Sequence, residues 1–278
     1  MLTKSSLLAS VLFATSALAG KRGLAWPWYN SPLDPGVLNN GFGEVVAIYD
    51  WETYSPPSST GGLGGLGWIG MQGCKDCSSS PVSQLAARHA QYGWATVFSV
   101  NEPDMPGTSN SMSPSEAAGW YKQWINPLAI KKALPAISSS SSAGQGLDWL
   151  QQMVSACAGG CYYDYINLHW YGTSFSEFQA YVNRAHSIFP NNQIVITEFA
   201  LTNPSGGQSA QVAFFRSAFQ WLDSVSWVEL YFPFVATSPS LLTAHGNGAA
   251  SFVGTGSCLY TDAGGPSAVG NLMYDGTI

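Results

Sequence analysis

Residues 95–104 read Ala-Thr-Val-Phe-Ser-Val-Asn-Glu-Pro-Asp, a short apolar run that leads directly into Asn101 and Glu102. A second apolar run, residues 193–200, reads Gln-Ile-Val-Ile-Thr-Glu-Phe-Ala and leads into Glu198. Runs of this length and composition are typical of buried strands. In a barrel of alternating strands and helices, the reactive groups lie at the carboxyl-terminal tips of the strands. Each glutamate alone could be ordinary, Glu102 in a turn before Pro103 and Glu198 at a strand end, but together they indicate one reactive face.

Eight strand-like runs alternate with helical stretches, which predicts an α/β fold closed into a single (β/α)8 TIM barrel. The expected strands are residues 23–26, 45–49, 67–71, 96–100, 134–138, 165–169, 194–197 and 228–232. The expected helices are residues 81–92, 113–125, 147–156, 176–189 and 208–224, with a closing helix over 268–274. A doubly wound open sheet is the alternative, but no glycine-rich phosphate loop follows the first run. The five serines of residues 138–142 mark a strand end that passes into a loop.

The composition excludes several kinds of partner. Only 9% of the 278 residues are charged and the net charge is −6, whereas about 25% charged residues is usual. A nucleic-acid-binding surface needs clustered Lys and Arg, and a membrane span needs about 20 apolar residues in succession. We therefore expect neither a nucleic-acid nor a membrane partner, and we expect a monomer.

Residues 1–19 have the pattern of a secretory signal peptide, with Lys4 before an apolar run and Ala17-Leu18-Ala19 as a small-x-small cleavage site. Residues 20–278 are then one folded domain, and the protein is expected to be secreted, either extracellular or associated with the cell wall. An oxidising compartment favours disulfides. We expect the local pairs Cys157–Cys161 and Cys74–Cys77, although Cys258 could instead pair with Cys74 or Cys77.

The pair of glutamates suggests a chemistry. Glu102 ends the fourth expected strand and Glu198 the seventh, so the two face one another across the barrel mouth. A retaining glycosidase uses two carboxyl groups about 5–5.5 Å apart, one as general acid and one as nucleophile. At that distance the two charges repel, which raises the pKa of one group and suits it to the acid role. Spacing does not decide which glutamate has which role.

Four motifs carry a resemblance to a known family: residues 21–26 (Lys-Arg-Gly-Leu-Ala-Trp), 101–104, 168–171 (Leu-His-Trp-Tyr) and 196–200. Together they resemble the fungal glycoside hydrolase family 128, β-1,3-glucanases of the clan of retaining (β/α)8 hydrolases. The resemblance implies that Glu102 is the acid/base, that Glu198 is the nucleophile and that residues 20–278 form a glycoside hydrolase catalytic domain. It implies a β-glucan substrate and neither cofactor nor metal. Residues 68–72 depart from the family pattern, which leaves the sugar contacts of that loop open.

Further residues are expected to support the pair. In the clan, the asparagine that matches Asn101 binds the sugar 2-hydroxyl; otherwise Asn101 stabilises a turn. His169 could donate a hydrogen bond to Glu198 or to a sugar, or could be a satisfied barrel histidine. The remaining histidines, His89, His186 and His245, are expected to be structural or on the surface. Aromatic side chains offer flat faces to sugar rings, and the candidates at strand ends are Trp26, Trp28, Tyr29, Trp51, Trp170, Tyr171 and Phe232.

The expected function is that of a secreted retaining hydrolase of β-1,3-glucan. Two alternatives stay open from the sequence. One is a cell-wall β-glucan-binding protein with little or no turnover, and the other is a hydrolase of the same clan that acts on β-1,4-linked glucan or mannan. Whether the cut falls within the glucan or at its end depends on loop shapes.

Overall fold

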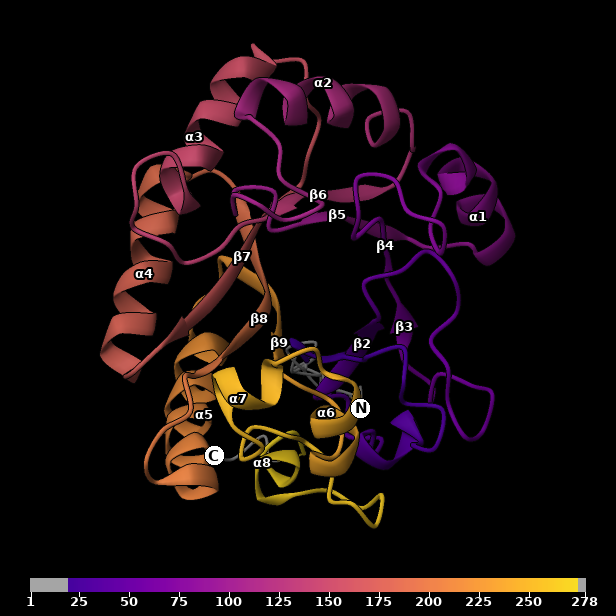
Figure 1. The fold of residues 1–278 in the computed structure, drawn as a ribbon, viewed down its shortest axis with the longest axis vertical. Helices are drawn as coiled ribbons and strands as arrows, with labels where there is room; N and C mark the ends of the chain where they lie inside the picture. The colour runs from indigo at the N-terminus through magenta and orange to yellow at the C-terminus, as the bar shows by residue number, and fades with distance from the viewer. Residues whose placement is uncertain (1–19, 275–278) are drawn as a thin grey trace, which may run out of the picture.

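The computed structural model describes residues 20–274, so the expected signal peptide at 1–19 lies outside the described residues. Nine parallel strands form one sheet that curls into a barrel, with helices around its outside (Figure 1). The strands are β1 (Arg22–Ala25), β2 (Val45–Tyr49), β3 (Gly67–Trp68), β4 (Gly70–Met71), β5 (Thr96–Asn101), β6 (Lys131–Ala136), β7 (Tyr165–Gly172), β8 (Gln193–Leu201) and β9 (Val228–Pro233).

The third expected strand is broken at one residue, and the break is where the barrel closes. The sheet order is β3-β2-β1-β9-β8-β7-β6-β5-β4, so its two edges are β3 and β4. These are successive pieces of one segment, separated only by Ile69. The backbone N–H of Ile69 donates to Ile48 on β2, at 3.0 Å, and β4 pairs with β5 on the other side. The segment therefore acts as one barrel strand, and the predicted barrel is confirmed.

Helices cover the outer face of the barrel. They are α1 (Leu85–Tyr92), α2 (Pro114–Trp124), α3 (Gly146–Cys157), α4 (Phe175–Ile188) and α5 (Gly207–Ser224), with the 3-10 helices η1 (Pro35–Leu38) and η2 (Val82–Gln84). The start of α2 follows from the sequence, because Ser113 and Glu116 form a reciprocal capping box and Pro114 occupies the first turn. Gly93 ends α1 in the left-handed conformation that glycine adopts without strain.

Two layers of apolar side chains stabilise this arrangement. The barrel interior is filled mainly by side chains from the strands: Ala25, Ala47, Tyr49, Ile69, Met71, Phe98, Ala133, Tyr165, Val195 and Phe232. A larger cluster lies between the strands and the helices, and includes Leu24, Ile48, Ile196, Phe178 and Phe215. Because successive residues of a strand point to opposite faces, strands buried on both faces read as continuous apolar runs. The interior is thus a packed core and not a pore.

Several expected boundaries are wrong. The fifth strand, expected at residues 134–138, is β6 at Lys131–Ala136, and Ile137 contributes one isolated bridge to Leu168. The register of the β5–β6 pair shifts twice. The closing helix is only α8 (Ala268–Asn271). Residues 81–92 divide into η2 and α1, with Pro81 as the residue that caps η2.

A C-terminal lobe follows β9 and lies beside the barrel mouth, in yellow in Figure 1. It contains two helices that the sequence did not predict, α6 (Pro239–His245) and α7 (Ala249–Val253). Both are short, so they offer little periodicity to read. Among the described residues, no helix combines the length and apolar character that crossing a membrane requires.

Candidate active site

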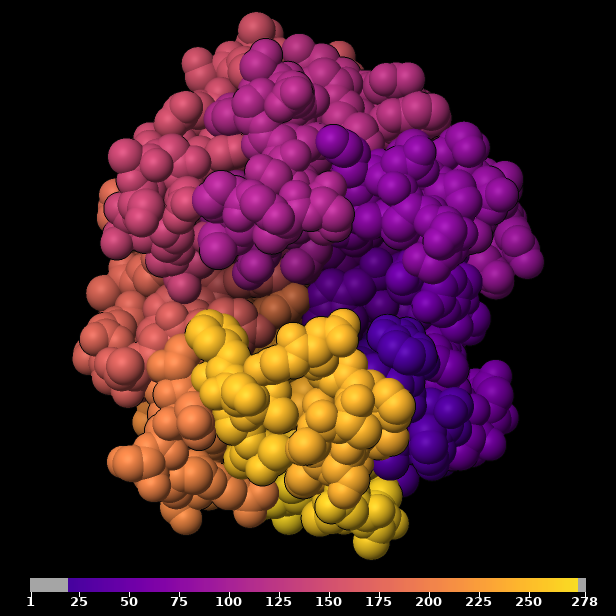
Figure 2. Space-filling model, viewed as in Figure 1, coloured from indigo at the N-terminus to yellow at the C-terminus, as the bar shows by residue number. Residues whose placement is uncertain are grey.

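The two predicted glutamates lie in one cavity at the carboxyl-terminal end of the strands. The cavity has a volume of about 730 Å³ and is lined by Asn101, Glu102, Tyr171 and Glu198 together with residues of the C-terminal lobe. Figure 2 shows the surface hollowed between that yellow lobe and the magenta segments of the middle of the chain. Glu102 follows β5 with a φ of 44°, and its N–H donates to Ala136 on β6. This uncommon backbone conformation marks a constrained position.

Glu198 is nearly buried and accepts hydrogen bonds on both of its oxygens. Trp51 donates from Nε1 to Oε1 at 2.7 Å, and Tyr171 donates from its hydroxyl to Oε2 at 2.6 Å. Trp51 reaches this position from a left-handed backbone conformation, φ 61°, two residues after β2 ends. Burial and the charge of Glu198 raise the pKa of Tyr171 well above its usual value, so its hydroxyl stays a donor. Two fixed donors suit a carboxylate that is ionised when it reacts.

His169 on β7 connects the two glutamates. Its Nδ1 lies 2.9 Å from Oε1 of Glu102, and its Nε2 lies 3.0 Å from Oγ1 of Thr197 and 3.4 Å from Oε1 of Glu198. The imidazole is fully buried. The sequence suggested that His169 could donate a hydrogen bond to Glu198 or to a sugar. In the structure its hydrogen bond to a glutamate goes to Glu102, and Glu198 lies 3.4 Å from Nε2.

A chain of hydrogen bonds decides which nitrogen of His169 carries a proton. Thr197 donates its hydroxyl proton to Oδ1 of Asn167, at 2.7 Å. Its oxygen can then only accept from His169, so Nε2 bears a hydrogen. At Nδ1 two arrangements are possible: protonated Glu102 donates to a neutral ring, or a charged ring donates to ionised Glu102. One proton is thus shared along the Glu102–His169 hydrogen bond.

The pKa directions follow from this arrangement. Burial acts to raise the pKa of Glu102, but the hydrogen bond and charge of His169 lower it below its ordinary value. Burial acts to lower the pKa of His169, but the carboxylates of Glu198 and Glu102 raise it. Burial, and the charge of Glu102, raise the pKa of Glu198, against the opposing effect of His169. In the free site the shared proton therefore favours the imidazole side of the pair.

Asn101, the last residue of β5, is held by its backbone. Its N–H donates to Gly73 at 2.9 Å, and its carbonyl accepts from Nδ2 of Asn110 at 3.1 Å. Its Oδ1 is buried and has no hydrogen-bond partner among the described residues. The fixed backbone and the unused side-chain oxygen suit a residue that meets a ligand.

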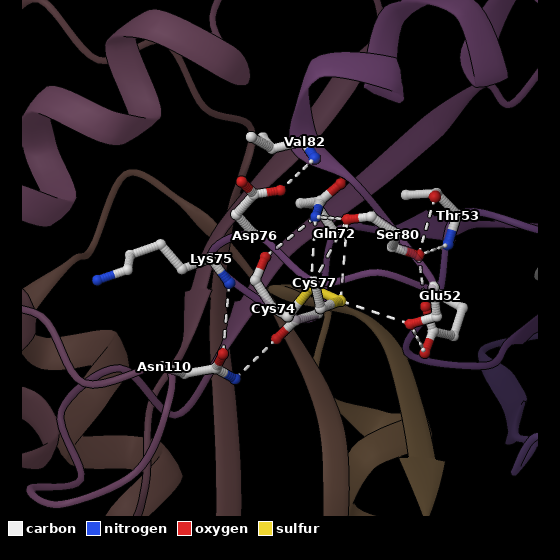
Figure 3. The surroundings of a disulfide bond; sticks show 12 residues. Glu52, Thr53, Gln72, Cys74, Lys75, Asp76, Cys77, Ser80, Val82 and Asn110 are labelled. Carbon is white, nitrogen blue, oxygen red and sulfur yellow. Dashed lines mark hydrogen bonds between the residues drawn. A yellow bond between two sulfur atoms is a disulfide. The ribbon is translucent and has the colours of Figure 1, made fainter.

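The Cys74–Cys77 disulfide closes a small loop that Asn110 contacts (Figure 3). Nδ2 of Asn110 donates to the carbonyl of Gly73 at 2.9 Å, and Oδ1 of Asn110 accepts from the N–H of Lys75 at 3.3 Å. The disulfide loop and the strand that presents Asn101 are thereby linked. The second expected disulfide, Cys157–Cys161, is also present, and Cys258 is a buried free thiol. Both local pairings are confirmed.

A second cavity adjoins the first on the other side of Glu198. It has a volume of about 370 Å³ and shares Asn101 and Glu198 with the first cavity, but not Glu102. Trp28, which is 57% exposed, and Tyr29 line this cavity, and both rings pack against His245 of α6. Of the aromatic residues that the sequence proposed for sugar binding, the structure thus brings Trp28, Tyr29, Trp51 and Tyr171 to the cavities.

Three predicted sugar-binding aromatics lie elsewhere, and their prediction is corrected. Trp26 is fully buried and donates to the carbonyl of Pro57. Trp170 is buried between β7 and the outer helices, stacked on Phe214. Phe232 is fully buried in the barrel interior. All three residues lie near strand ends, but their side chains point away from the cavities, and side-chain direction decides what they contact.

Sequence reasoning missed several lining residues. These are Asp50, Glu52, Met105, residues 138–140, His245, Asn247 and Phe252. The histidine at 245 was expected to be structural or on the surface; it packs on Trp28 and also lines the cavity. Asp50 and Glu52 lie within three residues of the end of β2, so their position after a strand was a signal that could have found them. The lining residues of the C-terminal lobe had no comparable signal, because the helices α6 and α7 that position them are too short to show a period in the sequence.

Comparisons with known proteins agree with this geometry. Residues 23–269 match the family model described as "Glycosyl hydrolase catalytic core". The crystal structure of a family 128 (subgroup IV) endo-β-1,3-glucanase from Lentinula edodes is 72% identical, with a TM-score of 0.88, and the match covers 92% of this chain and 100% of that chain. A family 128 (subgroup III) curdlan-specific exo-β-1,3-glucanase from Blastomyces gilchristii, in complex with glucose, is 26% identical with a TM-score of 0.69, over 94% of this chain and 99% of that one.

A curated relative, "Alkali-sensitive linkage protein 1" of Schizosaccharomyces pombe, is 32% identical over 263 residues. The match covers 92% of this chain but 45% of the relative, so the chain spans less than half the length of that protein.

Proposed function

The chain belongs to glycoside hydrolase family 128, and from this premise we propose that it is a secreted, retaining endo-β-1,3-glucanase. The observation that carries the proposal is the triad of side chains in which His169 contacts both Glu102 and Glu198 at the barrel mouth. The 72% identical structure from Lentinula edodes is of an endo-β-1,3-glucanase, which supports the same substrate here. Two disulfides and the sequence of residues 1–19 support secretion.

Glu198 is the nucleophile in this proposal. It attacks the anomeric carbon of the glucosyl unit in the cavity and forms a covalent glycosyl ester. The donors Trp51 and Tyr171 hold both carboxylate oxygens, which fixes their direction and stabilises the ionised form. Asn101 lies beside the nucleophile in both cavities. Its amide is placed to bind the 2-hydroxyl of the same glucosyl unit, an interaction that strengthens in the transition state.

Glu102 is the acid/base. In the first step it gives the leaving oxygen the proton that it shares with His169, and in the second step it takes a proton from water as the ester is hydrolysed. The ion-paired form of Glu102 and His169 must convert to the form with protonated Glu102 before the bond breaks. Since this moves one proton along one hydrogen bond, the conversion needs no change in side-chain position.

Endo action is supported by space on both sides of the nucleophile. The two cavities meet at Asn101, Glu198 and Phe234, and extend from there in different directions. A glucan can therefore continue past the cleaved bond at both ends. Exposed aromatic faces stand on each side, Trp28 in one cavity and Phe252 in the other.

The first test replaces each glutamate by its amide. Glu102→Gln removes the acid, which is expected to lower kcat/KM on laminarin by about 10²–10⁴-fold, and Glu198→Gln is expected to abolish release of reducing ends. The control is Glu229→Gln, a surface carboxylate on β9 far from the cavity. Near wild-type activity in either active-site variant would contradict the assignment. Tight oligosaccharide binding by the wild type without product would instead favour a glucan-binding protein.

A further inference from the structure

The serines of residues 138–142 border the catalytic cavity and also a third cavity next to it. Ser139 and Ser140 line both spaces, so the two are continuous along this segment. The third cavity, which we call the serine pocket, has a volume of about 320 Å³ and is lined by residues 139–143, Gln145, Leu147, Asp148, Gln151, Tyr181 and Arg184. Nothing in the proposed chemistry of Glu102 and Glu198 uses it.

The catalytic roles, which rest on the proposed function, give the bound glucan a direction. The nucleophile contacts the sugar that keeps its anomeric carbon on the enzyme, whereas the acid contacts the leaving sugar. Glu102 lines the cavity with the serines and is absent from the cavity with Trp28. The leaving, reducing-end part of the glucan therefore extends towards the serines, and the non-reducing part towards Trp28.

The serine segment is held rigidly relative to the acid. Asp104, two residues after Glu102, accepts from the N–H of Ser138 at 3.1 Å, from its hydroxyl at 2.5 Å and from the N–H of Gly146 at 2.8 Å. One buried carboxylate thus ties both ends of the loop to the turn that presents Glu102. Ser140 also donates to Gln145, at 2.5 Å. Such a preformed loop can bind without the entropic cost of being ordered.

The chemistry of the serine pocket fits a neutral, hydroxylated ligand. Arg184 provides guanidinium donors and Asp148 a carboxylate, so the charged side chains in the lining balance. Ser141, Ser142 and Arg184 are exposed, and within residues 20–274 their hydroxyls and guanidinium have no hydrogen-bond or ion-pair partner in the protein, so they are open to a ligand. A volume of about 300 Å³ is at the lower end of the range for small-molecule sites. Glucosyl units present hydroxyls that both donate and accept, which matches this mixture.

We propose that the serine pocket binds the reducing-end glucosyl units of β-1,3-glucan beyond the leaving sugar. The pocket makes hydrogen bonds to sugar hydroxyls, whereas the opposite end of the groove offers the exposed ring of Trp28. Binding energy gained there favours cleavage that leaves several glucosyl units on the reducing-end fragment.

The test uses laminarihexaose labelled at its reducing end with 2-aminobenzamide, and measures the lengths of the labelled products by chromatography. Arg184→Ala removes donors from the pocket, and Ser141→Tyr fills it. Both are expected to shorten the labelled products, and to lower kcat/KM by about three- to tenfold, the effect of losing one or two hydrogen bonds. The matched control is Arg216→Ala, which changes an exposed arginine on α5. It should leave the labelled product lengths and kcat/KM unchanged. Trp28→Ala should lengthen the labelled products.

The outcomes separate this proposal from the proposed function. If the wild type releases nothing from laminarin or laminarihexaose, the proposed function fails. If the wild type cleaves and Arg184→Ala and Ser141→Tyr give the wild-type product lengths, the serine pocket does not bind glucan and this inference is overturned. An aryl laminaribioside has a leaving group that does not reach the serine pocket. If Arg184→Ala and Ser141→Tyr lower kcat/KM on this substrate as much as on laminarihexaose, the variants damage the enzyme generally, and the inference is also overturned.

Discussion

In the proposed mechanism, the proton between Glu102 and His169 is the one that the leaving glucan receives. The hydrogen bonds from His169 through Thr197 to Asn167 fix Nε2 as a donor, so His169 exchanges protons with Glu102 only through Nδ1. The pair holds its last proton until the pH rises above the raised pKa of His169. Activity should therefore persist to a higher pH than a lone carboxylic acid would allow.

Replacing His169 by Asn should move the alkaline limb of the pH profile of kcat/KM to lower pH. The acid then is Glu102 alone, which loses its proton in a lower pH range than the pair does. Near neutral pH, kcat/KM should fall by at least about tenfold. The acid limb, which reports protonation of Glu198, should stay above the ordinary range of glutamate because burial raises that pKa. The measurement is the pH dependence of laminarin hydrolysis.

The control for this variant is His186→Asn, which removes a histidine that stacks on Trp227 away from the cavity. Its profile should match that of the wild type. A folded His169→Asn protein with an unchanged alkaline limb would show that His169 is only structural.

Side-chain direction explains which single residues could be predicted. His169 and Tyr171 contact the glutamates, and Trp170 between them faces the helices, as strand alternation requires. The same rule applied to Ala25, which faces the interior, places Trp26 outside. The alternation of side chains along a strand can be read from the sequence, and applying it would have removed Trp26 and Trp170 from the residues predicted to bind sugar. The left-handed backbone conformation that directs Trp51 towards Glu198 could not be predicted from the sequence, because no glycine marks that position.

Among the elements, the two small disulfide loops differ in what they hold. Cys74–Cys77 closes a loop that is joined through Gly73 and Asn110 to Asn101. Cys157–Cys161 closes the end of α3. Their sequence separations, 3 and 4 residues, are nearly equal. The two therefore form a matched pair for an experiment.

Replacing both cysteines of either pair by serine should lower the free energy of unfolding by about 2 kcal/mol, the loop-entropy estimate for such short loops. Only the Cys74→Ser/Cys77→Ser protein should also lose activity, by about tenfold, because a small displacement of Asn101 weakens its contact in the transition state. Urea unfolding and laminarin kinetics measure the two effects. Equal kcat/KM in both double variants would contradict the link to Asn101.

The C-terminal lobe shows where element prediction fails. Only a closing helix over residues 268–274 is predicted after the eighth strand, yet the lobe brings His245, Asn247 and Phe252 to the cavities. Helices of seven and five residues carry too few turns for an apolar period. The long helices α2 and α5, by contrast, were predicted almost to the residue, since they have clear caps or sustained amphipathic patterns.

At the scale of the whole molecule, strand counting placed the site. Parallel strands of a closed barrel present their carboxyl ends at one face, so Glu102 after β5 and Glu198 on β8 had to meet there. Cavity shape could not be predicted, because it depends on loops and on the C-terminal lobe rather than on the strands.

The configuration of the first product is the sharpest test of the proposed double displacement by Glu102 and Glu198. Proton NMR of laminarin mixed with fresh enzyme records the anomeric signals before mutarotation. Retention predicts that the β-anomer of the new reducing end appears first and the α-anomer grows later. Initial appearance of the α-anomer would mean a single displacement by water, and would contradict the assignment of Glu198 as nucleophile.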